Sequence, residues 1–299
     1  MEEDKETNKE NWHDKNYKVL LLIPLILLIL SFAYLAYFYA STGDFIRKDI
    51  SLTGGTSVTI YSQVDIEVLK LDLADKLEEI HVRDIYDIIT KEQKAVIIQT
   101  KSDGDITKST LEEYLGYTLD GKNSSFEFTG SSLSQSFYKQ LLIAILIAFL
   151  FMAIVVFIIF RTAIPSIAVI ISALADIVMT LALVNLFSMQ MSSAGIIALL
   201  MLIGYSVDTD ILLTTRILRR DEGSLNHRLL GSFKTGTTMT LTSIFAIAAA
   251  LFIIKSFSVV LTQIFTILVI GLLFDLLNTW ITNVSILKWY VKSKKKNEN

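Results

Sequence analysis

The sequence has no cysteine, and charged residues make up only 19% of its 299 residues. Without cysteine the chain can form no disulfide scaffold, no thiolate metal site and no thiol nucleophile. Lys and Arg (27) nearly balance Asp and Glu (30), so no strongly basic surface indicates nucleic acid as a partner. The three histidines, His13, His81 and His227, are far apart and lack the spacing of metal ligands, so we expect no metal site.

Apolar residues, in contrast, are abundant and grouped. They make up 52% of the chain and raise the mean hydropathy to +0.53, which is high for a soluble protein. They form runs of about 20 residues, the length of a helix that crosses a bilayer. The sequence therefore predicts a membrane protein with six transmembrane helices. The predicted spans are 19–40, 140–160, 165–187, 193–213, 239–254 and 258–287.

The distribution of Lys and Arg predicts the orientation of these helices. With a cytoplasmic N-terminus, the inside segments carry fifteen of these residues and the short outside loops carry one, Lys255. We therefore expect a multi-pass protein of the cell membrane with both termini in the cytoplasm. The predicted division is a cytoplasmic tail (1–18), a first transmembrane helix (19–41), an extracytoplasmic domain (42–137), five further transmembrane helices (138–290) and a basic cytoplasmic tail (291–299).

The extracytoplasmic segment has the composition of a domain that folds in water. Its periodicity predicts helices over 64–80 and 106–117, and β-branched residues predict strands over 57–62, 82–89, 95–99 and 125–129. The order β-α-β-β-α-β is that of a ferredoxin-like α+β domain. Its acids have no catalytic spacing, and we find no nucleophile with a base and no phosphate loop. We therefore expect neither an enzyme nor a cofactor.

A glycine pair lies at the start of this domain. Thr53, Gly54 and Gly55 separate a short predicted strand (50–52) from the strand that begins at Ser57. Such a pair usually makes a tight turn or lets two backbones approach closely. We predict this structural role for it.

Acids within the predicted spans are the main candidates for function, because a carboxylate at the centre of a membrane helix costs roughly 2.5–3.5 kcal/mol. Asp176 lies eleven residues from Pro165, which places it roughly 16 Å into the membrane, near the midplane. Asp208 and Asp210 lie nearer the cytoplasmic side. Because they are about 200° apart on a helix, they cannot share a face, and Asp210 alternatively reaches the membrane interface.

Asp275 in the last span lies on a polar stripe with Asn278, Thr279 and Asn283. Interhelical hydrogen bonds alone would explain the Asn and Thr residues. Arg216 is the only cation close to the fourth span, so protonation is the alternative way to neutralise these acids. Buried acids that lose and regain a proton can form a proton relay. The candidate relay residues are Asp176, Asp208, Asp210, Asp275 and Arg216.

Several motifs, in order along the chain, resemble those of the SecF family of protein-export membrane proteins, which are relatives of the RND transporters. They are LTGGT at 52–56, LAD at 174–176, GYSVDTD at 204–210 with Arg216, and TTMTLTS at 237–243. Gly204 opens the third motif. The form of that motif, the compact length and the FDLL segment at 274–277 are similar to archaeal members of the family.

The resemblance implies a partner and a mechanism. A SecF-like half bundle pairs with a SecD homologue of similar layout, giving twelve helices in the lipid bilayer beside a SecYE-type translocon. The pair is thought to use the proton gradient to help draw an unfolded preprotein across the membrane. Asp176 matches the family's third-span acid. The bacterial fourth-span acid falls at the position of Thr209, so Asp208 or Asp210 takes its place, or the coupling differs.

Two other functions are compatible with the sequence. The first is a structural subunit that stabilises the translocon and holds the preprotein by the external domain, which the shifted fourth-span acid favours. The second is an RND-type half-transporter for lipids or small molecules. Against the second, the chain has one external domain and half the usual number of spans.

Overall fold

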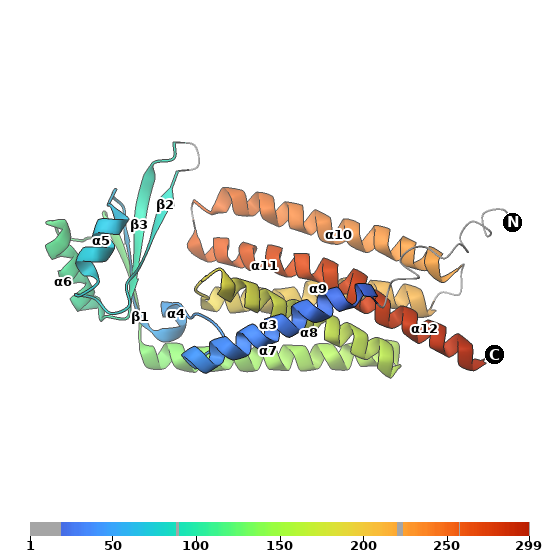
Figure 1. The fold of residues 1–299 in the computed structure, drawn as a ribbon. Helices are drawn as coiled ribbons and strands as arrows, with labels where there is room; N and C mark the ends of the chain where they lie inside the picture. The colour runs from blue at the N-terminus through green and yellow to red at the C-terminus, as the bar shows by residue number, and fades with distance from the viewer. Residues whose placement is uncertain (1–18, 88–89, 220–223, 257, 299) are drawn as a thin grey trace.

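The computed structural model describes residues 19–87, 90–219, 224–256 and 258–298, and they form a bundle of long helices with a small sheet domain at one end (Figure 1). The predicted tail 1–18 lies outside the described residues. The long helices are α3 (Leu22–Thr42), α7 (Ser131–Phe160), α8 (Ala163–Leu186), α9 (Ser193–Arg219), α10 (Leu225–Ile254) and α11 (Val259–Leu277), the last continuing through η1 (Asn278–Asn283) into α12 (Val284–Glu298).

By length and composition, six helical segments of the described chain can cross a membrane, in agreement with the six predicted spans. Two of the helices are longer than their apolar runs. α7 already begins at Ser131, directly after the last strand, and α10 begins at Leu225, where the Ser224 hydroxyl accepts a hydrogen bond from the His227 backbone N–H. A helix continues past its apolar run because its backbone hydrogen bonds do not depend on apolar side chains.

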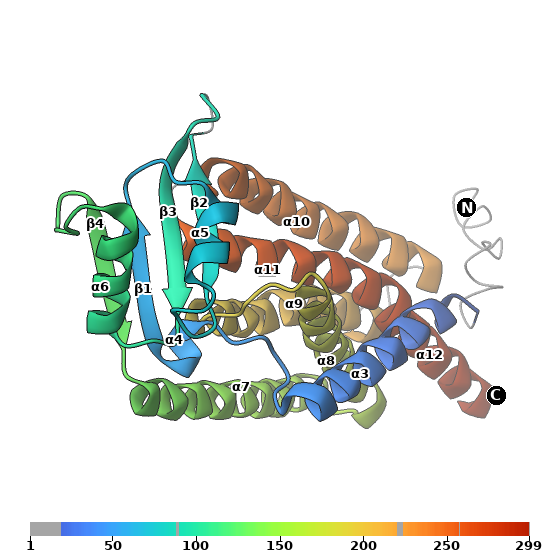
Figure 2. The ribbon, with the colours of Figure 1, turned by 60° about the vertical axis from the view of Figure 1, so that its left-hand side comes forward.

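The sheet domain contains four antiparallel strands in the order β2-β3-β1-β4, with the two helices between them on one face. This is the predicted ferredoxin-like arrangement. In the view of Figure 1 the two helices lie on the side of the sheet away from the bundle, and in the turned view of Figure 2 they come forward, in front of the sheet. The elements are β1 (Gly55–Ile60), α5 (Ile66–Leu73), β2 (His81–Tyr86), β3 (Gln93–Thr100), α6 (Gly104–Leu115) and β4 (Ser124–Thr129).

The two faces of the sheet differ because side chains alternate along each strand. In β1, Val58 and Ile60 are fully buried in a core shared with the two helices. The neighbouring Ser57 and Thr59 point the other way and line a cavity of about 530 Å³ between the sheet and the near end of the bundle. We call that end of the bundle the domain end.

The segment that leads from α3 to the sheet differs from the prediction. Residues 50–52, predicted as a short strand, belong to a one-turn helix, α4 (Ile50–Thr53). Asp49 precedes it, and its carboxylate accepts a hydrogen bond from the backbone N–H of Ser51 at 2.6 Å. The prediction was wrong because this N-terminal cap stabilises a helical turn that the apolar pattern does not reveal.

The glycine pair has the predicted structural role. Gly54 has φ +85° and Gly55 has φ +137°, conformations that residues with a side chain rarely adopt. A Cβ on Gly54 would lie 2.4 Å from the Cα of Ser131, and a Cβ on Gly55 would lie 2.3 Å from the carbonyl oxygen of Thr100. Both glycines therefore allow two backbones to meet where the sheet joins α7.

Glycine also sets the packing of α9 on α11. A Cβ on Gly271 would lie 2.4 Å from a methyl group of Leu202, which is fully buried. We expect Gly271→Ala to destabilise the protein by about 1–3 kcal/mol, since overpacking forces a buried side chain out of its preferred conformation. Thermal unfolding in detergent measures this loss.

A matched control for this prediction is Gly204→Ala, in the same bundle. Apart from its own helix, no described residue lies within 4 Å of a Cβ placed there, so the stability of the isolated chain should stay within about 1 kcal/mol of the parent. Leu202→Ala combined with Gly271→Ala should lose less stability than the sum of the two single changes. Strict additivity would show that the contact with Leu202 is not the cause.

Candidate functional site

Three carboxylates are buried between the membrane helices. Asp176 on α8, Asp210 on α9 and Asp275 on α11 each have a relative exposure of 0%. Asp176 lies ten residues, or roughly 15 Å, from the last residue of α8 at the domain end. All three therefore lie well inside segments that are long enough to cross a membrane.

Asp176 is held by two neutral side chains from different helices. The Ser206 hydroxyl of α9 donates to Asp176 Oδ2 at 2.5 Å, and Asn278 Nδ2 of η1 donates to Asp176 Oδ1 at 2.7 Å. Both oxygens of this acid are thus paired, and the carboxyl group links three helices. Any change in its charge or hydrogen bonding acts on all three of them.

Asp210 and Asp275 share one hydroxyl group. Thr279 Oγ1 lies 2.9 Å from Asp210 Oδ1 and 3.1 Å from Asp275 Oδ1, and Asn283 Nδ2 donates to Asp210 Oδ1 at 2.7 Å. Within the described residues, the second carboxyl oxygens of Asp210 and Asp275 are buried without a hydrogen-bond partner. A buried polar oxygen without a partner is costly, and more so when it is charged.

The Thr279 hydroxyl lies within hydrogen-bond distance of two acids at once. A threonine hydroxyl carries a single hydrogen and donates one strong hydrogen bond at a time. The contacts of Thr279 with Asp210 and with Asp275 can both be strong hydrogen bonds at the same time only when one of the two acids is protonated and donates to the hydroxyl oxygen. Thr279 therefore links the two acids through its single hydroxyl group.

The backbone helps to direct this stripe of side chains. Residues Asn278–Asn283 form a π-helix, in which hydrogen bonds run from residue i to i+5. Asn278, Thr279 and Asn283 are fully buried, and they face acids on two neighbouring helices. The sequence reveals the polar stripe but not the π-helix, because the local hydrogen-bond pattern leaves no mark in the residue spacing.

The structure separates the predicted candidates. Asp208 and Asp210 do lie on different faces of α9, but Asp210 is the buried one and Asp208 is exposed on the bundle surface. The Asp210 side chain is covered by neighbouring helices and does not reach the surface of the bundle. Gly204, one turn before Asp208, is also exposed. Of the two fourth-span acids, only Asp210 therefore lies with Asp176 and Asp275.

Arg216, the predicted cationic candidate, is bonded elsewhere. Its Nη1 donates to the carbonyl oxygen of Gly231 at 2.8 Å and to the Thr235 hydroxyl at 3.1 Å, both on α10. The hydrogen bonds to the three buried acids come instead from Ser, Thr and Asn side chains. In the described ranges no group of three or more His, Asp or Glu residues is placed to hold a metal ion.

Sequence reasoning missed Ser206 as a partner of Asp176. Ser206 lies four positions before Asp210 and so shares its face of the helix. That shared face is the available signal, since a serine one turn from a buried acid faces the same neighbouring helices. The thirty-residue separation between Ser206 and Asp176 hides the contact itself.

Comparison with known proteins assigns the chain to a family. The family described as "Protein export membrane protein SecD/SecF, C-terminal" matches residues 110–293. A protein-export membrane protein SecF of Methanocaldococcus jannaschii is 40% identical over 284 residues, covering 93% of this chain and 96% of that protein. This chain belongs to the SecF family. A SecF of Methanothermobacter thermautotrophicus is 37% identical, with 93% and 94% of the two chains covered.

Solved structures of SecDF share the fold of this SecF-family chain. The SecDF of Thermus thermophilus, described as a translocon-associated membrane protein, matches with a TM-score of 0.74 at 17% identity. A SecDF in a super-membrane-facing form matches with a TM-score of 0.60 at 18% identity. In both cases 95% of this chain is covered but only 39% of the SecDF chain, so this chain spans about two fifths of those larger proteins.

Proposed function

We propose that this SecF-family chain is an accessory subunit of Sec protein export that acts with a SecD homologue beside a SecYE-type translocon. In this proposal the complex helps unfolded preproteins across the membrane and draws on the proton gradient. The single observation that carries the proton role is that Asp176, Asp210 and Asp275 are all buried between the helices, each hydrogen-bonded to neutral side chains.

The energy available from protons is of the right size for this role. One elementary charge that crosses 100 mV is worth about 2.3 kcal/mol. Two conformations of a protein commonly differ by a few kcal/mol, so this energy can change which of them is populated. The acids join three helices, and protonation of one acid would alter contacts that hold these helices together.

The orientation belongs to the same proposal. The last helix ends away from the sheet domain (Figure 1), and it carries Lys288, Lys292 and Lys294. Positive residues of this kind favour the cytoplasmic side. The sheet domain then lies outside the cytoplasm, where it can meet a preprotein that leaves the translocon.

The proposal is tested by export into inverted membrane vesicles that contain the chain with its SecD homologue and translocon. We expect the chain to speed the completion of export, and a protonophore to remove this stimulation. Vesicles without the chain serve as the control and should respond less to the protonophore. Stimulation that persists in full without a proton gradient would refute the proton role.

The cavity between the sheet and the domain end of the bundle favours a second function, in which the chain only holds the preprotein. Polar side chains such as Ser57, Thr59 and Gln99 line this cavity and could hydrogen-bond to an extended polypeptide. The protonophore experiment separates the two functions, because simple holding does not depend on the gradient.

One face of α9 supports the proposed SecD partner. Its exposed residues recur every three or four positions, and we call them the α9 outer face. They are Ile197, Met201, Gly204, Tyr205 and Asp208. A carboxylate that faced lipid would cost roughly 2.5–3.5 kcal/mol, and a glycine lets two membrane helices approach closely. Both features favour a partner helix on this face.

We therefore expect Gly204→Leu to prevent assembly with the SecD homologue while the isolated chain still folds. The reason is that, among the described residues, no atom outside the adjoining part of α9 lies within 4 Å of a Cβ at residue 204. Co-purification of the two chains from membranes measures assembly. Ala249→Leu, an exposed position on α10, is the matched control and should assemble normally. Normal assembly of Gly204→Leu would exclude this face.

A further inference from the structure

The loop between α8 and α9 lies at the meeting point of the sheet domain and the helices that carry the buried acids. We infer that this loop, together with Asn185 and Gln263, is the connection through which the acids and the sheet domain influence one another. We call loop residues 187–192 with these two side chains the junction. The inference rests on the proposed proton coupling and assigns positioning residues to it.

The first observation is how firmly the junction holds the segment that enters the sheet domain. Asn185 Nδ2 donates to the carbonyl oxygen of Phe45 at 2.6 Å, and its Oδ1 accepts from the backbone N–H of Arg47 at 3.2 Å. The backbone of Met191 then bonds to Arg47 at 2.6 Å and to Asp49 at 3.1 Å. Four hydrogen bonds thus join segment 45–49 to α8 and its loop.

A second contact reaches the sheet itself. Arg83 of β2 donates from Nη2 to Gln190 Oε1 at 2.8 Å. The cavity of about 530 Å³ separates much of the remaining sheet face from the bundle. A displacement of the loop would therefore be transmitted to the sheet domain at particular points, rather than being spread over a tightly packed interface.

The third observation concerns the opposite side of the loop. Gln263 of α11 is 7% exposed and bonds through Nε2 to the carbonyl oxygen of Gln190 and through Oε1 to the hydroxyl and backbone N–H of Ser192. A single buried amide thus fixes the loop to α11. Each of its hydrogen-bonding groups is used, so its removal leaves buried loop groups without partners.

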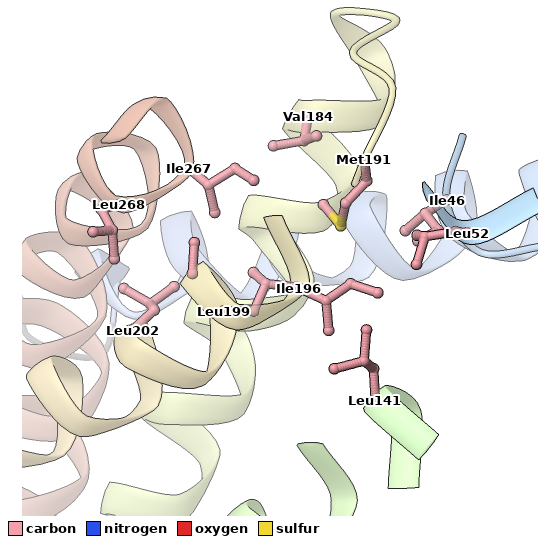
Figure 3. Packing of buried hydrophobic residues seen from close by; sticks show 11 residues of the cluster. Ile46, Leu52, Leu141, Val184, Met191, Ile196, Leu199, Leu202, Ile267 and Leu268 are labelled. Carbon is pink, nitrogen blue, oxygen red and sulfur yellow. The ribbon is translucent and has the colours of Figure 1, made fainter. Parts of the chain in front are cut away.

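Apolar packing supports the same connection (Figure 3). Met191 of the loop, Ile46 of the entering segment and Leu52 of α4 belong to one buried cluster with Ile196 of α9 and Ile267 of α11. Packed interiors are dense and transmit displacement. The loop, the entering segment and the two helices should consequently move together.

The three helices that meet at the junction are those that carry the acids. Asn185 is nine residues from Asp176 on α8, which is roughly 14 Å, and Gln263 is twelve residues from Asp275 on α11, roughly 18 Å. α9, which carries Asp210, begins directly after the loop. Helices of this length are stiff, so a shift at the acids reaches the junction with little loss.

The test measures the position of the sheet domain relative to the bundle by electron spin resonance. Because the chain has no cysteine, spin labels attach only at introduced Leu71→Cys on α5 and Lys255→Cys at the end of α10, both exposed. The labelled chain is studied in lipid discs in complex with a cysteine-free SecD homologue. We expect Asp176→Asn to shift the distribution of label distances.

The decisive variant adds Gln263→Leu, which should abolish that shift, and Asn185→Leu should do the same. Gln140→Leu, an exposed glutamine on α7, is the matched control and should leave the shift intact. Unfolding midpoints and co-purification with the partner verify that the variants fold. A shift that survives Gln263→Leu, or no shift with Asp176→Asn, would overturn the inference. Export measured separately with Asp176→Asn reports on the proposed proton role itself.

Discussion

Asp176→Asn is expected to abolish the stimulation of export by the proton gradient and to reduce export to the level seen without this chain. Asparagine keeps the size of the side chain, but it cannot take up or release a proton in the way a carboxyl group does. Ser206 and Asn278 remain available as partners, so the three helices should still assemble. Export into inverted vesicles, with and without a protonophore, measures the loss.

The control for this variant is Thr180→Val on the same helix. Thr180 lies one turn from Asp176 and is fully buried, and its hydroxyl has no hydrogen-bond partner among the described residues. Valine has nearly the same shape, so gradient-dependent export should persist. If Asp176→Asn also exports normally in response to the gradient, the proton role of this site is wrong.

Gly54→Ala is expected to destabilise the base of the sheet domain strongly, by about 3 kcal/mol or more. Two unfavourable effects add at Gly54. An alanine would be held in a strained backbone conformation, with φ at +85°, and its Cβ would clash with the Cα of Ser131 at 2.4 Å. Because the obstructing atom belongs to the backbone, a change of side-chain rotamer cannot relieve the contact. Thermal unfolding and the rate of limited proteolysis between the sheet domain and α7 measure the effect.

Gly116→Ala separates these two costs. Gly116 follows the last turn of α6 with φ +74°, but apart from its chain neighbours no atom in the described part of the chain lies within 4 Å of a Cβ placed there. Only the unfavourable backbone conformation remains, and we expect a loss of about 1 kcal/mol. Equal losses for the two variants would show that the contact with Ser131 is unimportant.

The sheet domain was largely predictable from its sequence. Alternating residues such as Ser57, Val58, Thr59 and Ile60 specify which side of a strand is buried, and this pattern needs no knowledge of distant contacts. The helix predicted over 64–80 is shorter in the structure, where α5 covers Ile66–Leu73. The helical spacing of apolar residues continues beyond Leu73 because Leu77 also belongs to the core, although it is not in a helix.

The sequence predicts how far each acid lies along its helix, but not which acids come together. Counting residues along each span predicts that Asp176 lies near the membrane centre, because the rise of a helix per residue is constant. The same geometry shows that Asp208 and Asp210 face different ways. It does not tell which of them faces inward, since that depends on how α9 is rotated against α8 and α11.

The sequence by itself therefore determined the six spans, the ferredoxin-like order of the sheet domain and the presence of acids within the membrane. These features follow from hydropathy and periodicity, which are properties of neighbouring residues. Only the tertiary structure decided that Asp210 rather than Asp208 joins Asp176 and Asp275, and that Arg216 bonds to α10. The physical reason is that these contacts depend on helix rotation and packing: Asn278 meets Asp176 across 102 residues and Thr279 meets Asp210 across 69.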